Sequence, residues 1–80
     1  MTTDEAIDHL QAVLADIAPD ADLRDIKRTA NLREELDIDS MDFLRLVQGV
    51  HARTGIDVPE GDYRKVATLD ALVAYLVGKA

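Results

Sequence analysis

The chain has 80 residues, of which 48% are hydrophobic and 31% are charged, and this composition is typical of one compact domain with a single core. Its 16 acidic and 9 basic residues give a net charge of −7, which disfavours nucleic acids and anionic membranes as partners. A domain of this size has little room for an enclosed active site beside its core, and the absence of cysteine excludes disulfides and thiolate metal sites.

The first predicted helix covers residues 3–17. Thr2 and Glu5 have the spacing of a capping box, in which each side chain binds the backbone amide of the other residue. Pro19 ends the helical pattern of apolar residues. The buried stripe of this helix is predicted to contain Ile7, Leu10, Leu14 and Ile17.

A long connection runs from Asp20 to Asp39, and it is too apolar to be a free linker. Asn31 stands three residues before Glu34, a spacing that is typical of the start of a helical turn. We therefore expect the connection to pack across the other helices through Leu23, Ile26, Leu32, Leu36 and Ile38.

The second long helix is predicted to begin at Asp39 or Ser40 and to end where Gly55 takes the position after the last helical turn. Residues 56–59 are predicted to be extended, because Pro59 keeps the residue before it out of the helical region. The buried stripe of the helix contains Phe43, Leu46, Val47 and Val50.

The remaining residues predict a short helix over Asp62 to Val66 and a final helix that Thr68 caps and Gly78 ends. The stripe of this final helix contains Leu69, Leu72, Val73 and Leu76. With no sustained strand pattern, the expected fold is all-α. It is an antiparallel four-helix bundle of three longer helices and one short helix, with a long first crossover loop, in a single domain over residues 1–80.

The most informative position is Ser40, which ends a dense acidic run where a helix begins. The positive end of a helix favours an anion, so a phosphodiester on this serine would be stabilised there. Asp37, Asp39 and Asp42 flank the serine and could help to hold Mg²⁺ from a modifying enzyme. The plainer alternative is that Asp39 or Ser40 is only a helix N-cap, which is the commoner role of an isolated Asp-Ser pair.

A catalytic role for Ser40 is disfavoured. A nucleophilic serine needs a base, and His51 lies eleven residues along the same helix, about 16 Å away at the usual helical rise. No Gly-x-Ser-x-Gly turn surrounds the serine. A calcium loop starting at Asp37 would place Gln48 where that loop needs glutamate. We therefore expect neither an enzyme nor a metal site.

Residues 31–77 resemble the acyl carrier proteins. Leu36-Asp37-Ile38-Asp39-Ser40-Met41-Asp42-Phe43 stands where that family has its Asp-Ser-Leu attachment motif, and Ile56-Asp57-Val58-Pro59 resembles the segment after the family's second helix. The resemblance implies a four-helix bundle and a 4′-phosphopantetheine arm transferred from coenzyme A to Ser40, between Asp39 and Met41. It implies a carrier of acyl thioesters that is not itself a catalyst.

The same resemblance implies which proteins the chain meets. They are a phosphopantetheinyl transferase and acyl ligase, synthase or acyltransferase enzymes, which a monomeric carrier serves. In the family the acyl chain can fold back into the apolar interior, here lined by Phe43, Leu46, Val47, Val50, Ile56 and Leu72. The alternative function is a helical protein-interaction or regulatory module that shares the bundle and is never modified.

Two departures from the family bear on the partners. Met41 replaces the usual leucine after the serine, and the second helix lacks the usual acidic ridge. This predicts service to a specialised pathway, with fatty-acyl, polyketide, aminoacyl and peptidyl cargo all open. The polar, acidic start and the lack of a long apolar run predict a cytoplasmic location without membrane insertion. The residues expected to bind partners are Asp42, Arg45, Gln48, His51, Glu60 and Asp62.

Overall fold

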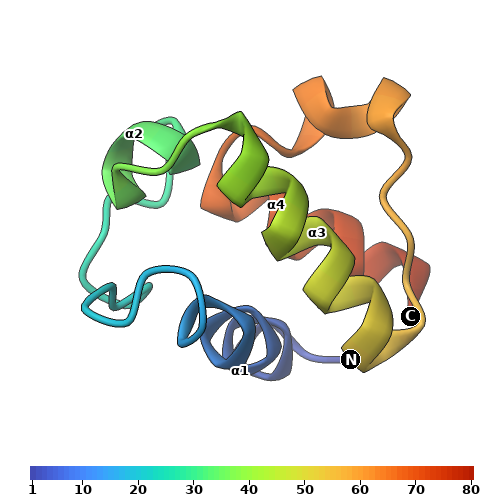
Figure 1. Ribbon diagram of the computed structural model, residues 1–80. Coiled ribbons are helices and arrows are strands. Elements are labelled where there is room, and N and C mark those ends of the chain that lie inside the picture. The colour runs from blue at the N-terminus through green and yellow to red at the C-terminus, as the bar shows by residue number, and fades with distance from the viewer.

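A computed structural model describes all 80 residues and contains five helices and no β-sheet (Figure 1). The all-α prediction is confirmed. The expected helical turn after Asn31 is a short helix of its own. In chain order the elements are α1 (Thr3–Leu14), α2 (Leu32–Leu36), α3 (Ser40–Thr54), the 3-10 helix η1 (Glu60–Val66) and α4 (Leu69–Lys79).

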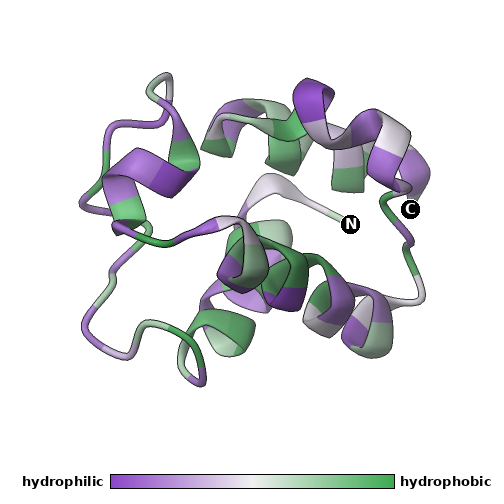
Figure 2. Cartoon of the chain, turned by 45° about the horizontal axis from the view of Figure 1, so that its top comes forward, coloured by the Kyte–Doolittle hydropathy of each residue, from purple (hydrophilic) through white to green (hydrophobic).

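The helices form one bundle in which α1 packs against both α3 and α4, and α4 also packs against η1. In Figure 1, α3 crosses the centre of the molecule in front of α4, with α1 below. The elements α2 and η1 lie on the side away from α1, and the two chain ends lie close together in Figures 1 and 2. None of these helices has the length and apolar character needed to cross a membrane.

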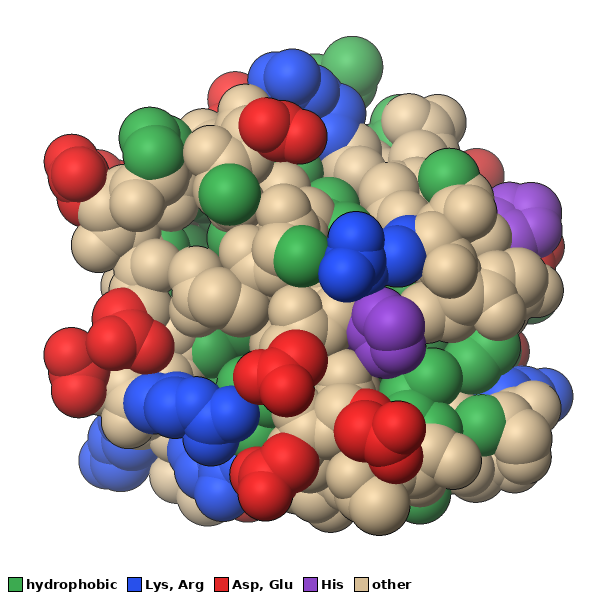
Figure 3. Space-filling model, turned by 90° about the horizontal axis from the view of Figure 1, so that it is seen from below, with side chains coloured by type: hydrophobic (Ala, Val, Ile, Leu, Met, Phe, Trp, Pro, Cys, Tyr) green, Lys and Arg blue, Asp and Glu red, His purple; other side chains and the backbone are tan.

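The core is entirely apolar, and it contains the predicted stripes of the three long helices with the exception of Ile17, which is half-buried. No polar or charged side chain is buried. Figure 2 shows the apolar residues in bands along the helices, alternating with polar bands. Seen from the side of α1, acidic and basic side chains are interspersed and do not form patches of one sign (Figure 3).

Side-chain caps begin the four α-helices, as the sequence predicts. Thr2 and Glu5 form the full capping box at the start of α1. Asn31, Asp39 and Thr68 each accept a hydrogen bond from the backbone amide three residues later. At the other end of α3, Gly55 has a φ of 77°, which explains why a glycine ends this helix.

Three predicted boundaries are wrong. Helix α1 ends at Leu14 because the next amides bond three residues back, Asp16 to the Val13 carbonyl and Ile17 to the Leu14 carbonyl. Helix η1 begins at Glu60, directly after Pro59, and not at Asp62. Helix α4 runs through Gly78 to Lys79. A glycine often ends a helix by adopting left-handed backbone angles. Gly78 does not adopt them, so the helix continues through it.

The long connection between α1 and α2 is fixed at several points. The side-chain amide of Gln11 donates to the Ala21 carbonyl at 2.8 Å and accepts from the Leu23 amide at 2.9 Å. Further along, the Glu35 carboxylate accepts from the Lys27 amide at 2.7 Å. The start of α2 is joined to the segment before α4, since the amide of Leu32 donates to the carbonyl of Ala67 at 2.7 Å.

Helices α1 and α3 approach each other closely at Gly49. A Cβ atom built on this glycine would overlap the Val13 side chain. The close approach therefore needs a glycine although the residue has ordinary helical geometry.

Candidate functional site

Ser40 is the first residue of α3 and the only serine of the chain. The preceding residue, Asp39, has extended backbone angles, and its carboxylate accepts a hydrogen bond from the Asp42 amide at 2.8 Å. Asp39 is thus the cap, and the exposed Ser40 hydroxyl forms no hydrogen bond within the protein. The serine oxygen lies at the positive end of a 15-residue helix and is free to be modified.

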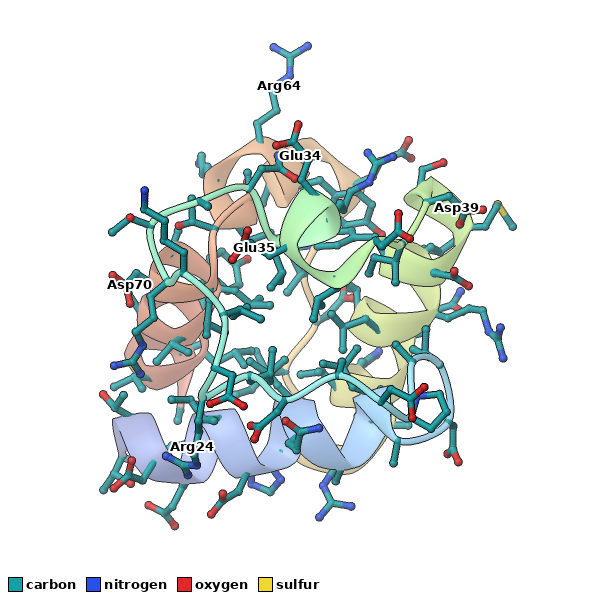
Figure 4. The ribbon with its side chains drawn as sticks, turned by 90° about the vertical axis from the view of Figure 1, so that its left-hand side faces the viewer. Arg24, Glu34, Glu35, Asp39, Arg64 and Asp70 are labelled. Carbon is teal, nitrogen blue, oxygen red and sulfur yellow. The ribbon has the colours of Figure 1, made fainter.

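A tight corner positions this serine. Asp37 closes α2 in the left-handed conformation, with φ 53° and ψ 48°, and its amide bonds back to the carbonyls of Arg33 and Glu34. Only Ile38, which is half-buried, separates this residue from the cap of α3. The acidic side chains of the region diverge, because Glu34, Glu35 and Asp39 point to different sides of the corner in Figure 4.

An open groove of about 500 Å³ adjoins Ser40. It lies between the start of α2, the first turns of α3 and η1. The rings of Phe43 and Tyr63 meet edge to face, with centroids 5.6 Å apart, and Met41 beside them is 64% exposed. The residues lining the groove are Asn31, Arg33, Ser40, Met41, Phe43, Leu44, Glu60, Tyr63, Arg64 and Ala67.

The interior residues expected to surround an acyl chain lie mostly away from this groove. Of the six, Phe43 alone lines it. Leu46, Val47, Val50 and Leu72 are buried in the core, at most 3% exposed, and Ile56 is half-buried against that core. The groove is therefore a surface feature that meets the apolar stripe of α3 only at Phe43.

The predicted partner-binding residues of α3 lie on its outer surface. Arg45 approaches Asp42 at 3.6 Å, one turn earlier. His51 Nδ1 lies 3.9 Å from the carboxylate of Asp57. Gln48 is exposed and has no side-chain hydrogen bond. These residues can be reached by a partner that approaches Ser40 along the helix.

The two predicted partner-binding residues of η1 have different surroundings. Glu60 lines the groove beside Ser40. Asp62 accepts a hydrogen bond from the Tyr75 hydroxyl at 2.9 Å and lies 3.4 Å from Lys65 Nζ. These contacts, the tyrosine bond first, lower the pKa of Asp62, and the same bond raises the pKa of Tyr75. Asp62 thus tethers η1 to α4, and its role in partner binding remains a prediction.

Sequence reasoning missed the two arginines of the groove. Arg33 comes from α2 and Arg64 from η1, so the fold brings together residues that are far apart in the chain. Neither arginine forms part of a motif or a helical stripe. The only signal available was that both are basic residues on elements next to the attachment motif.

Comparison with known proteins gives consistent matches. Residues 8–76 match the family model described as a phosphopantetheine attachment site. The chain is 27% identical to an acyl carrier protein of Rubrobacter xylanophilus, over 96% of this chain and 94% of that protein. It is 30% identical to an acyl carrier protein of Campylobacter hominis, over 75% of this chain and 71% of that protein. It is also 25% identical to a mitochondrial acyl carrier protein of Neurospora crassa, over 95% of this chain and 57% of that protein.

Proposed function

Because the chain belongs to the acyl carrier protein family, defined by its phosphopantetheine attachment site, we propose that Ser40 is the residue that takes the arm. Members of this family carry covalent 4′-phosphopantetheine and are carriers, not catalysts. The observation that carries the assignment is the free Ser40 hydroxyl at the first position of α3, where Asp39 already supplies the cap. Asp39 and Met41 flank the attachment point.

The attachment is a phosphoryl-group transfer to the serine oxygen. The Ser40 oxygen bonds to the phosphorus next to pantetheine in coenzyme A, the pyrophosphate link breaks, and adenosine 3′,5′-bisphosphate leaves. The hydroxyl proton passes to a base of the transferase, since the neighbouring Asp39 carboxylate already accepts a hydrogen bond as the cap of α3. A phosphodiester on Ser40 would lie at the start of α3, where the free backbone amides favour a negative charge. When bound, the group supplies a thiol that holds an acyl chain as a thioester.

The competing function is an unmodified helical module for protein interaction. It leaves the free serine hydroxyl and the adjoining groove without a role. Incubation with coenzyme A and a phosphopantetheinyl transferase, followed by intact-mass analysis, separates the two functions. A carrier gains the mass of one phosphopantetheinyl group, located by fragmentation on Ser40. A chain that stays at its original mass with an active transferase is an interaction module.

The surface of α3 supports a specialised partner. Arg45, Gln48 and His51 replace an acidic ridge with positive and neutral groups, although Asp42 offsets Arg45 in part. We therefore propose that the dedicated ligase, synthase or acyltransferase has a mixed or acidic docking patch, because a basic patch would meet like charges. The cytoplasmic location and the monomeric state remain predictions; the relative from Neurospora crassa is mitochondrial.

A further inference from the structure

The groove beside Ser40 contains two arginine side chains without a charged partner. Of the nine basic residues, Arg24, Arg28, Arg45 and Lys65 lie within 4.0 Å of a carboxylate. Arg53 donates to His9, and Lys79 lies over the ring of Tyr75. Lys27, Arg33 and Arg64 have no such side-chain partner, and the last two line this groove.

No carboxylate lies within 4.0 Å of either arginine, although Glu34 and Asp37 line a neighbouring hollow together with Arg33. Glu60 is the one carboxylate among the lining residues, and it forms no ion pair with either arginine. Asp62, also on η1, is held by Tyr75 and Lys65. The lining residues thus include two arginines and one carboxylate, on a chain whose net charge is −7.

The rest of the groove is apolar. Its surface includes Met41, Phe43, Leu44 and Tyr63, and Ser40 lies in the same wall. A surface that combines hydrocarbon with guanidinium groups is complementary to an amphipathic anion, and guanidinium matches the two oxygens of a carboxylate. A group attached through an arm on Ser40 would be tethered beside this surface.

Arg64 and Ser40 lie at different ends of the groove. In Figure 4, Arg64 projects from η1 well away from the start of α3, which Asp39 marks. A phosphodiester on Ser40 lies next to Asp39, so it is not the anion that Arg64 is placed to meet. An anion that contacts Arg64 would have to be carried farther along the arm.

On the basis of the proposed carrier function, we infer that the groove binds a carboxylated acyl group, with its chain on the apolar wall and its carboxylate at Arg33 and Arg64. Exposed ion pairs are individually weak. The covalent arm offsets this weakness because it holds the carboxylate at a high effective concentration near the two arginines. An acyl chain of the same length without a carboxylate lacks the polar half of this contact.

The test compares two cargoes of equal length. Wild-type protein is loaded with hexanoyl-pantetheine or adipyl-pantetheine from the corresponding coenzyme A thioesters, and intact mass confirms the loading. Amide chemical shifts of Arg33, Tyr63 and Arg64 are then compared, together with the rate of thioester cleavage by hydroxylamine. The adipyl form is expected to shift these amides and to be cleaved several-fold more slowly, and both differences should shrink as salt is added.

Matched variants locate the effect. The Arg33→Gln/Arg64→Gln double variant should lose the difference between the two cargoes and keep the hexanoyl behaviour. Arg28→Gln, whose arginine pairs with Asp70 outside the groove, should retain it. All four substituted or paired residues are exposed, so circular dichroism should show an unchanged fold.

Failure of the carrier function and failure of the cargo assignment give different results. A protein that gains no mass on Ser40 contradicts the carrier function and, with it, the cargo assignment. A loaded protein that treats adipyl and hexanoyl alike overturns the cargo assignment alone. The cargo assignment is also overturned if the cargo difference survives in the double variant, and loss of partner binding in that variant would then assign the arginines to an acidic partner surface.

Discussion

The Tyr75 hydroxyl donates a hydrogen bond to the Asp62 carboxylate, with 2.9 Å between the oxygens. This bond joins α4 to η1, the element that contributes Glu60, Tyr63 and Arg64 to the groove. The bond requires a protonated tyrosine and an ionised aspartate. This one link between η1 and α4 is therefore present only within a limited range of pH.

Removal of this bond should change the pH profile of stability. The lowered pKa of Asp62 means that its contribution is present above the ordinary value of 3.8 and lost as pH falls through the lowered value. The raised pKa of Tyr75 means that its contribution is present below 10.0 and lost as pH rises through the raised value. Tyr75→Phe should lower the melting temperature between these limits and converge with wild type beyond them.

The control for this experiment is Tyr63→Phe. The Tyr63 ring packs on Phe43, and its hydroxyl forms no hydrogen bond within the protein. Thermal melts of the three proteins across the full pH range provide the comparison. A Tyr75→Phe profile that runs parallel to wild type at every pH would show that the bond does not couple stability to titration.

Two adjacent residues, Asp39 and Ser40, should have separate roles, one in capping α3 and the other in modification. Ser40→Ala removes the attachment oxygen and leaves the cap intact, so it should abolish the mass gain with little change in stability. Asp39→Ala removes the cap and should lower the free energy of unfolding by about 1 kcal/mol. Urea unfolding and intact mass measure the two effects. Modification of the Ser40→Ala variant at another residue would disprove the assignment.

Because α1 and α3 approach closely at Gly49, a substitution of this glycine should destabilise the protein, and a smaller residue at Val13 should restore the lost stability. Gly49→Ala places a methyl group against Val13, and such overpacking costs about 1–3 kcal/mol. Alanine's better helix propensity offsets about 1 kcal/mol of this loss. In a Val13→Ala background the clash is absent, so Gly49→Ala should become neutral or stabilising. Chemical denaturation of all four proteins in the cycle checks the coupling, which additive effects would refute.

The outer surface of α3 should decide how a generic fatty-acid synthase handles the loaded protein. Replacement of positive and titratable groups by acidic ones in Arg45→Glu/His51→Glu should raise the rate of elongation by enzymes with basic docking patches. Arg53→Glu is the matched control, because Arg53 donates to His9 on α1 and is not among the residues expected to bind the partner. Equal rates for the double variant and wild type would mean that this surface does not select the partner.

Local signals in the sequence predict most of the helices. The start of α3 and its end at Gly55 follow from the Asp39 cap and from a glycine with positive φ, both of which depend on neighbouring residues alone. The end of α1 does not follow from such signals. The hydrogen bonds of its last turn span three residues and not four, at the carbonyls of Val13 and Leu14. There the chain leaves the helix and enters the connection, to which the Gln11 side chain of α1 is hydrogen-bonded.

The candidate site also has one part that the sequence predicts and one part that it does not. Ser40 is identifiable from the sequence because its motif is contiguous. The groove is not, since it depends on how α2, α3 and η1 are placed in three dimensions, and that placement rests on contacts such as Leu32 with Ala67 and Asp62 with Tyr75. Asp62 shows the limit most clearly, because its sequence position suggests an exposed contact residue and its actual partner is on another helix.

The corner between α2 and α3 determines where the chain can be lengthened. Since only Ile38 lies between the closing residue of α2 and the cap of α3, an added residue there would displace one of the two from its helix. An insertion within the first turn of α3 would rotate Ser40 by about 100° relative to Phe43 and carry it out of the groove. Pro19 and Asp20 are exposed and lie outside the helices, so an insertion there would disturb only the turn that the Ala21 amide closes on the Ala18 carbonyl. A reporter peptide inserted there would label the carrier while leaving Ser40 and the groove unchanged.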